Sequence, residues 1–239
     1  MIPSTPRRTL VFLLLSTAVF FVPDLIVPDA WTKTSAYKLL DSLYLGLVIL
    51  AGFALGPWMG RLMMTREVAS GPVRWAVDHA LASLGGKHYD PPIRVFEHRA
   101  PFVLTAGLWP SQCEVFLSSG MVGRHSHAGL RFLMARARVH ARFTHRLAAV
   151  VPVLLLTVAI PDTPHDVGDW GLLGLILLGW LLVHWASELG VDRQAAILMG
   201  PDARMGLSEM LQAGASGHPA LTLLPARWRT RQMARMRWD

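Results

Sequence analysis

Four runs of apolar residues, separated by polar or mixed stretches, dominate the pattern along the 239-residue chain. They run from Leu10 to about Val27, from Leu43 to about Met59, from Leu147 to Ile160 and from Gly171 to Trp185. The third run contains Pro152 and is shorter than the roughly 20 residues that a helix needs to cross a bilayer. The pattern therefore predicts about four membrane helices, namely two at the amino terminus and a later hairpin of two that inserts less deeply.

The first run has the length of a signal peptide, but the residues after it do not resemble a cleavage site. Small residues are expected at such a site, whereas Pro23, Asp24, Pro28 and Asp29 stand here. We therefore expect the first helix to remain as a membrane anchor.

The stretches between the membrane runs predict a small mixed domain. Helical spacing of apolar positions is found at 61–84, 128–146, 187–199 and 205–213. Three short runs of strand-forming residues, at Ile93–Glu97, Phe102–Ala106 and Val115–Ser118, are bounded by Pro, Gly or Ser, which is typical of a small antiparallel sheet. The fold class predicted is an α+β integral membrane protein.

Composition supports this class and excludes others. The chain is 52% hydrophobic and 16% charged, whereas an ordinary soluble domain is about 25% charged. A disordered chain, a coiled coil and a typical cytosolic enzyme are therefore excluded. A single cysteine, Cys113, excludes a disulfide framework and a cysteine-rich metal site.

The basic residues are distributed unevenly around the apolar runs. Of the 23 Lys and Arg residues, all but Lys33 and Lys38 lie in the amino terminus, in 58–146 or in 188–239. Because basic loops stay in the cytoplasm, we expect both termini and the soluble part to be cytoplasmic, with the chain in a bacterial inner membrane. The net charge of +7 is then explained without nucleic acid, which we consider an unlikely partner.

Four motifs carry a resemblance to a known family. They are Pro101 to Gly107 (PFVLTAG), Val115 to Val122 (VFLSSGMV), the helix Leu130 to His140, and the E-x-x-x-D sequence from Glu188 to Asp192. In this order, with a membrane hairpin before the last, they resemble HtpX-type membrane zinc metallopeptidases, relatives of the CAAX prenyl proteases. The resemblance covers roughly residues 10–215. It implies a membrane helix pair (1–60), a gluzincin-like helix and β-hairpin part (61–146), a membrane hairpin (147–187) and a remainder with a basic tail (188–239).

The family's zinc site is not intact in this chain. Such a site needs two His one helical turn apart, a Glu beside the first as general base, and a ligand from a later helix. The resemblance puts Arg136 at the first His and Ala137 at the Glu, while His140 and Glu188 remain as ligands. Arginine stays protonated and cannot ligate zinc. We therefore expect no cofactor and instead an ion pair of Arg136 with Glu188, with Arg136, Glu188 and Asp192 in structural roles.

Two functions from different classes follow from this reading. The first is a catalytically inactive homologue that serves as a scaffold, adaptor or subunit of a membrane protein complex. Its partner would bind along the family's substrate-binding edge strand, at Phe102, Val103, Leu104 and Thr105. The alternative is an active zinc metalloendopeptidase with an atypical site, built from His140, Glu188 and one of His125, His127, His145 or His184.

The carboxyl-terminal tail supports a third hypothesis, a tether to the membrane surface. Basic and aromatic residues alternate there, at Arg227, Trp228, Arg229, Arg231, Arg235 and Trp238. Such interleaving favours anionic lipid, although it also fits nucleic acid. Arg138 and Arg142, one helical turn apart, are a second candidate for lipid contact.

Overall fold

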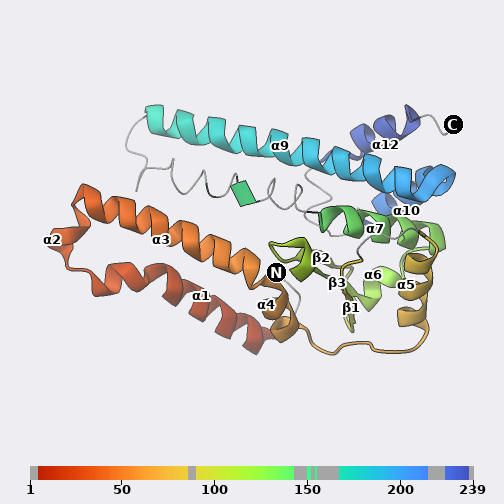
Figure 1. Cartoon of the computed structure of the whole chain (residues 1–239), viewed down its shortest axis with the longest axis horizontal. Coiled ribbons are helices and arrows are strands. Elements are labelled where there is room, and N and C mark those ends of the chain that lie inside the picture. Colours follow the sequence, from red (N-terminus) through yellow and green to blue (C-terminus); the bar gives the residue numbers. More distant parts are fainter. Residues whose placement is uncertain are drawn as a thin grey trace.

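The computed structural model describes residues 5–85, 90–142, 150–151, 154, 167–214 and 224–236. These residues are mostly helical and contain one small sheet (Figure 1). The elements are α1 (Pro6–Ile26), α2 (Asp29–Thr32), α3 (Ser35–Ala54), α4 (Gly56–Met63), α5 (Pro72–Ala82), β1 (Ile93–Phe96), β2 (Val103–Ala106), η1 (Pro110–Gln112), β3 (Glu114–Ser118), α6 (Ser119–Val122), α7 (His127–His140), α9 (Val167–Met199), η2 (Gly200–Asp202), α10 (Ala203–Gly214) and α12 (Ala226–Ala234).

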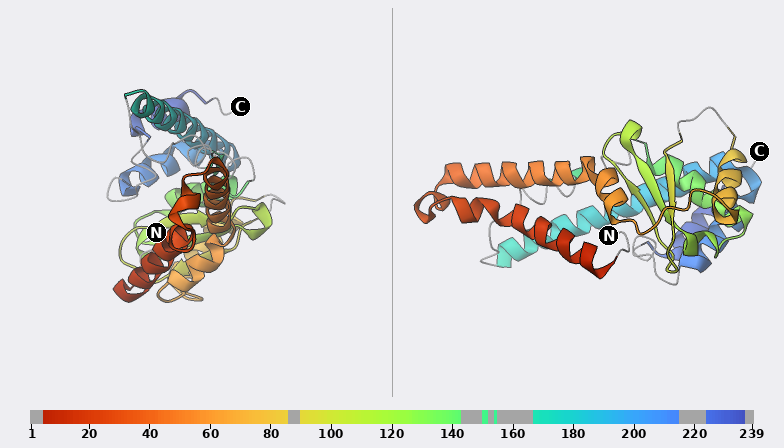
Figure 2. Two further views of the ribbon diagram at one scale, coloured as in Figure 1. Left: turned by 90° about the vertical axis from the view of Figure 1, so that its left-hand side faces the viewer. Right: turned by 90° about the horizontal axis from the view of Figure 1, so that it is seen from below.

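One end of the molecule consists of long apolar helices. The hairpin of α1 and α3 extends away from the sheet, and the amino-terminal half of α9 runs in the same direction (Figures 1 and 2). Two stretches among the described residues, Ser35–Ala54 and Trp170–Gln212, are long and apolar enough to cross a membrane. The count of about four membrane helices stays a prediction, because most of 147–160 lies outside the described residues.

The second apolar helix does not have the predicted bounds. It begins at Ser35 because the Thr34 side chain accepts a hydrogen bond from the Tyr37 amide (3.2 Å), and it ends at Ala54. A separate helix, α4, then starts at Gly56 with Pro57 in its first turn. The predicted run from Leu43 to about Met59 is therefore divided between two helices.

The single helix predicted over 61–84 is wrong. The chain leaves α4 at Met64 and runs extended beside β1, with the Val68 amide bonded to the Val95 carbonyl (2.7 Å). It re-enters a helix only at Pro72, after Gly71 at φ 99°. A proline disfavours the α conformation at the residue before it, and a positive φ suits glycine. Gly71 and Pro72 therefore end the extended segment and start α5.

The sheet has the strand order β1-β3-β2. The predicted pairing of β2 with β3 is present, antiparallel, with Leu104 opposite Phe116. The expectation of a wholly antiparallel sheet is wrong, because β1 runs parallel to β3. Only β2 and β3 form a hairpin. The loop that connects them begins at Gly107, whose φ of 116° suits glycine. The central strand β3 is buried along its whole length.

Helix α7 lies at the centre of the helical part and packs against α5, α9 and α10. Its amino terminus is capped by the Ser126 hydroxyl, and most of its residues are buried. The predicted end at Arg146 is not reached within the described residues, since α7 ends at His140. Helix α9 continues without interruption through residues 187 and 188. The apolar core joins α5, the sheet, α7, α9 and α10.

Candidate functional site

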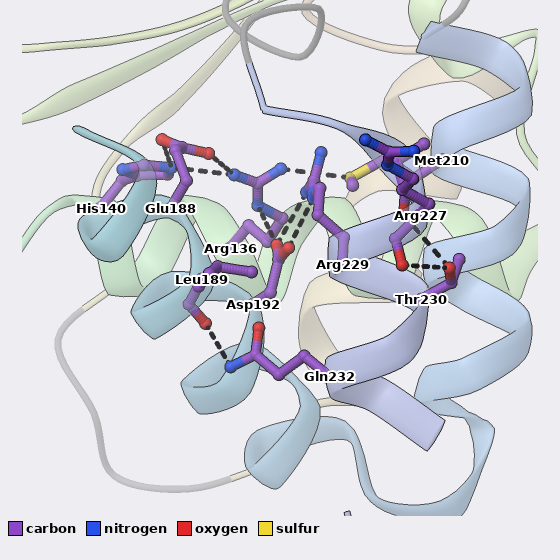
Figure 3. Close-up of polar contacts among 11 residues, drawn as sticks. Arg136, His140, Glu188, Leu189, Asp192, Met210, Arg227, Arg229, Thr230 and Gln232 are labelled. Carbon is purple, nitrogen blue, oxygen red and sulfur yellow. Dashed lines mark hydrogen bonds and ion pairs between the residues drawn. The ribbon is translucent and has the colours of Figure 1, made fainter. Parts of the chain in front are cut away.

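The facing sides of α7 and α9 bring four polar residues together (Figure 3). Arg136 and His140 lie one turn apart on α7, and Glu188 and Asp192 lie one turn apart on α9. Arg136, Glu188 and Asp192 are buried, while the His140 side chain is 29% exposed. His140 and Glu188 therefore lie close together, as predicted, and Arg136 lies on the buried side of the pair.

The Arg136 guanidinium binds both carboxylates. Its Nη2 donates a hydrogen bond to Glu188 Oε2, and its Nε lies 3.2 Å from Asp192 Oδ1. The remaining nitrogen, Nη1, donates to the sulfur of Met210 on α10 at 3.6 Å. The expected contact of Arg136 with Glu188 is thus present and direct, and a second acid shares the guanidinium.

His140 completes the exposed side of this cluster. Its Nε2 lies 3.5 Å from Glu188 Oε1 and 3.4 Å from Arg136 Nη2. A neutral imidazole can accept a hydrogen bond from the guanidinium at this nitrogen. His140 and Glu188 are therefore adjacent, and both face the guanidinium.

A second arginine joins from the carboxyl-terminal helix. Arg229 on α12 is fully buried and donates from Nε to Asp192 Oδ2 (2.6 Å) and from Nη2 to Asp192 Oδ1 (2.8 Å). Gln232, one turn later, donates to the Leu189 carbonyl at 3.0 Å. The prediction that Arg229 binds lipid is wrong, because its side chain points into the protein and pairs with Asp192.

The cluster is electrostatically balanced. Burial lowers the pKa of Arg136, but attraction by Asp192 and Glu188 outweighs burial and leaves that pKa above its ordinary value. Burial and repulsion by Arg136 lower the pKa of Arg229, and Asp192 offsets only part of this. Two guanidinium groups and two carboxylates alternate from Glu188 through Arg136 and Asp192 to Arg229. Each buried charge therefore has an opposite charge beside it, as buried ions require.

A zinc ion does not fit these residues. A catalytic zinc site needs three protein ligands, and arginine, which the motif resemblance puts at the first ligand position, cannot ligate zinc. Among the residues that the structure describes, no three His, Cys, Asp or Glu side chains lie close enough to hold a metal ion. This covers His125, His127 and His184, whereas His145 lies outside the described residues. The neighbouring Ala137 is buried and carries no acid or base.

Comparison with solved structures finds the crystal structure of S. mikatae Ste24p, with a TM-score of 0.56 and 13% sequence identity. The fold is similar to that of Ste24p. The match covers 95% of this chain and 66% of Ste24p, so the chain spans just under two thirds of that protein's length. No protein-family model matches the sequence, and no curated protein matches it. At this identity the likeness to Ste24p concerns the fold alone.

The four residues predicted to bind a partner lie along the outer strand of this Ste24p-like fold. Val103, Leu104 and Thr105 belong to β2, and Phe102 precedes it. The Phe102 ring packs at the edge of Phe96, with 6.0 Å between ring centroids, and its amide donates to the Ser118 hydroxyl (2.9 Å). Phe102 is therefore anchored in the protein, whereas the Leu104 side chain is exposed.

Two of the arginines proposed for lipid contact have other surroundings. Arg138 is buried and donates to both carboxylate oxygens of Asp90 and to the Gly85 carbonyl (2.8 Å). Its assignment to lipid is wrong. Arg142 is exposed and donates to Gln194 Oε1 on α9 at 2.5 Å.

The other tail residues divide by position. Arg227, Trp228 and Arg231 are exposed on α12, Arg235 is exposed just after it, and Trp238 lies outside the described residues. Sequence reasoning missed the bonds of Arg138 to Asp90 and of Arg229 to Asp192. A signal existed for the second, because two acids one turn apart on α9 need more than one cation. No sequence signal distinguishes Arg229 from the neighbouring arginines.

Proposed function

We propose that this chain is a catalytically inactive homologue of the HtpX-type and CAAX-type membrane metallopeptidases. It serves as a scaffold, adaptor or regulatory subunit of a membrane protein complex. The family motifs in their order support the homology, and the fold, which is similar to that of Ste24p, agrees with it. The distribution of basic residues supports a location in the inner membrane of a bacterium, with the sheet on the cytoplasmic side.

One observation carries the loss of activity, namely the position of the Arg136 guanidinium. It lies one turn before His140 and is bonded to Glu188, so a cation covalently part of the chain stands beside both remnant ligands. A metal ion would have to enter next to this fixed positive charge. Repulsion between the Arg136 guanidinium and any metal cation, together with the missing His ligand, accounts for the loss of zinc and disfavours other metals as well.

The loss of the general base reinforces this conclusion. Hydrolysis by a zinc peptidase requires a carboxylate that takes a proton from the metal-bound water. Ala137 at that position is buried and cannot move a proton. The proposed role is therefore binding, with the outer strand β2 as the surface along which an extended segment of a partner would lie.

Metal analysis of the full-length protein, purified from membranes without chelators, tests the proposal. We expect no stoichiometric zinc, and no difference in peptide hydrolysis before and after treatment with a zinc chelator. About one equivalent of tightly bound zinc, together with chelator-sensitive hydrolysis, would establish the alternative of an atypical metalloendopeptidase.

A further inference from the structure

The first two turns of α12 present a cationic and aromatic surface that the charge cluster does not use. Arg229 and Met233 are buried, which fixes the rotation of the helix about its axis. Arg227, Trp228 and Arg231 consequently point away from the core and are exposed. No acidic residue occurs in α12, and no hydrogen bond or ion pair of the Arg227 or Arg231 side chain is present within the described part of the chain.

These turns lie where the apolar surface of α9 ends. The Trp228 ring meets the Trp185 ring edge-on, with 5.2 Å between centroids. On α9 the exposed large apolar side chains continue from Trp170 to Val183, and the next is Ile197. Gln232, further along α12, donates a hydrogen bond to the Leu189 carbonyl. Helix α12 therefore starts near Trp185 and runs along α9 away from its apolar end (Figure 1).

We propose that the first two turns of α12 bind the headgroup of an anionic phospholipid at the membrane surface. Tryptophan is enriched at the boundary between hydrocarbon and water, and Trp185 and Trp228 mark that boundary on this face. The guanidinium groups of Arg227 and Arg231, one helical turn apart, supply donors for a phosphate. This site is independent of the proposed loss of catalysis.

Lipid fits this surface better than nucleic acid does. Single-stranded nucleic acid binds aromatic rings whose faces are open for stacking, whereas the Trp228 ring is in edge-to-face contact with the Trp185 ring. The two arginines continue directly from an apolar helix surface. A phospholipid matches both the apolar surface and the arginines, with its acyl chains along α9 and its phosphate at α12.

The test measures lipid selectivity of the full-length chain in bilayers. The fraction of motionally restricted spin-labelled phosphatidylglycerol, relative to phosphatidylcholine, is determined by electron paramagnetic resonance. The variant Arg227→Gln/Arg231→Gln is compared with Arg193→Gln/Arg235→Gln. This control removes the same charge from exposed positions, Arg193 on α9 and Arg235 just after α12. Arg193 lies about 12 Å beyond Trp185 along α9.

We expect the first variant to lower the preference for phosphatidylglycerol by at least roughly five-fold, since each arginine near an anionic surface contributes about that factor. The control should change it by less than about two-fold. Equal losses in both variants would overturn the proposal in favour of unspecific attraction. No loss in either, or a loss only of binding to a single-stranded oligonucleotide, would also overturn it. Unchanged thermal unfolding of both variants shows that they are folded.

Discussion

Arg229 on α12 donates hydrogen bonds to both carboxylate oxygens of Asp192 on α9, at 2.6 and 2.8 Å, and the pair is completely buried. The bond joins α12 to the cluster of Arg136, Glu188 and Asp192 between α7 and α9. Asp192 thereby shares its charge between Arg136 and Arg229. The docking of α12 and the integrity of the cluster consequently depend on one another.

Replacement of Arg229 by methionine should release α12. It leaves Asp192 with one cation instead of two and removes the polar anchor of the helix, at a cost of about 3–5 kcal/mol. Trypsin should then cleave after Arg227 and Arg231 faster than in the unmodified protein. Arg235→Met, at the exposed residue that follows α12, is the control and should leave the rate of cleavage after Arg227 and Arg231 unchanged. Equal protection of Arg229→Met and the unmodified protein would contradict the anchoring role.

The pair of Arg136 with Glu188 should show strong coupling in a double-mutant cycle. Arg136→Met or Glu188→Leu alone should lower the free energy of unfolding by about 3–5 kcal/mol, because each leaves a buried charge with fewer partners. The double variant should be less destabilised than the worse single variant. Unfolding in detergent by denaturant measures this. Additive effects would show that the two side chains stabilise the fold independently.

Stability should fall at acidic pH through Glu114. Burial raises the pKa of Glu114, but hydrogen bonds from Arg61 (3.0 Å) and Arg94 (2.9 Å) outweigh burial and leave that pKa below 4.5. A carboxyl with a lowered pKa in the folded state stabilises above its unfolded pKa, and this contribution disappears as the pH falls through the folded pKa. Unfolding measured between neutral pH and about pH 3 should show the loss, and Glu114→Gln should show less of it.

Two substitutions should restore a metal site. Arg136→His and Ala137→Glu together recreate the H-E-x-x-H sequence, with Glu188 as the third ligand. We expect about one equivalent of zinc in the double variant, measured by metal analysis, and a higher melting temperature with zinc than with chelator. Arg136→Met removes the guanidinium without adding a ligand and should not bind zinc. Failure of the double variant to bind zinc would mean that α7 and α9 do not hold the ligands as the family does.

Labelling of introduced cysteines should report the orientation. A cysteine at Lys33, between α2 and α3, should react with a membrane-impermeant reagent in intact cells, and one at Arg124 should react only after lysis. The native Cys113 is buried and provides a low background. The opposite pattern would invert the assignment of the sheet to the cytoplasm.

The sequence by itself determined the features that depend on local order and spacing. A turn of helix separates Arg136 from His140 and Glu188 from Asp192, so each pair was bound to share a face of its helix. The strands of the β2-β3 hairpin are close in the chain and bounded by Gly107, so their pairing followed from local signals. The contact of Arg136 with Glu188 was predicted from the ligand positions that the family resemblance implies and from the cost of burying an unpaired carboxylate.

Tertiary structure alone decided which distant residues complete these local patterns. Arginines alternate along the tail with a period of two, whereas a helix has 3.6 residues per turn, so only docking on α9 selects Arg229 as the buried one. In the same way, the sequence around Arg138 suggests an exposed arginine, and only the folded structure brings Asp90 beside it in a buried pair. Parallel β1, and the extended segment before Gly71, likewise depend on a neighbour across the sheet. Charge pairs and strand neighbours between residues far apart in the chain leave no periodic trace in the sequence, because their geometry exists only once the helices have packed.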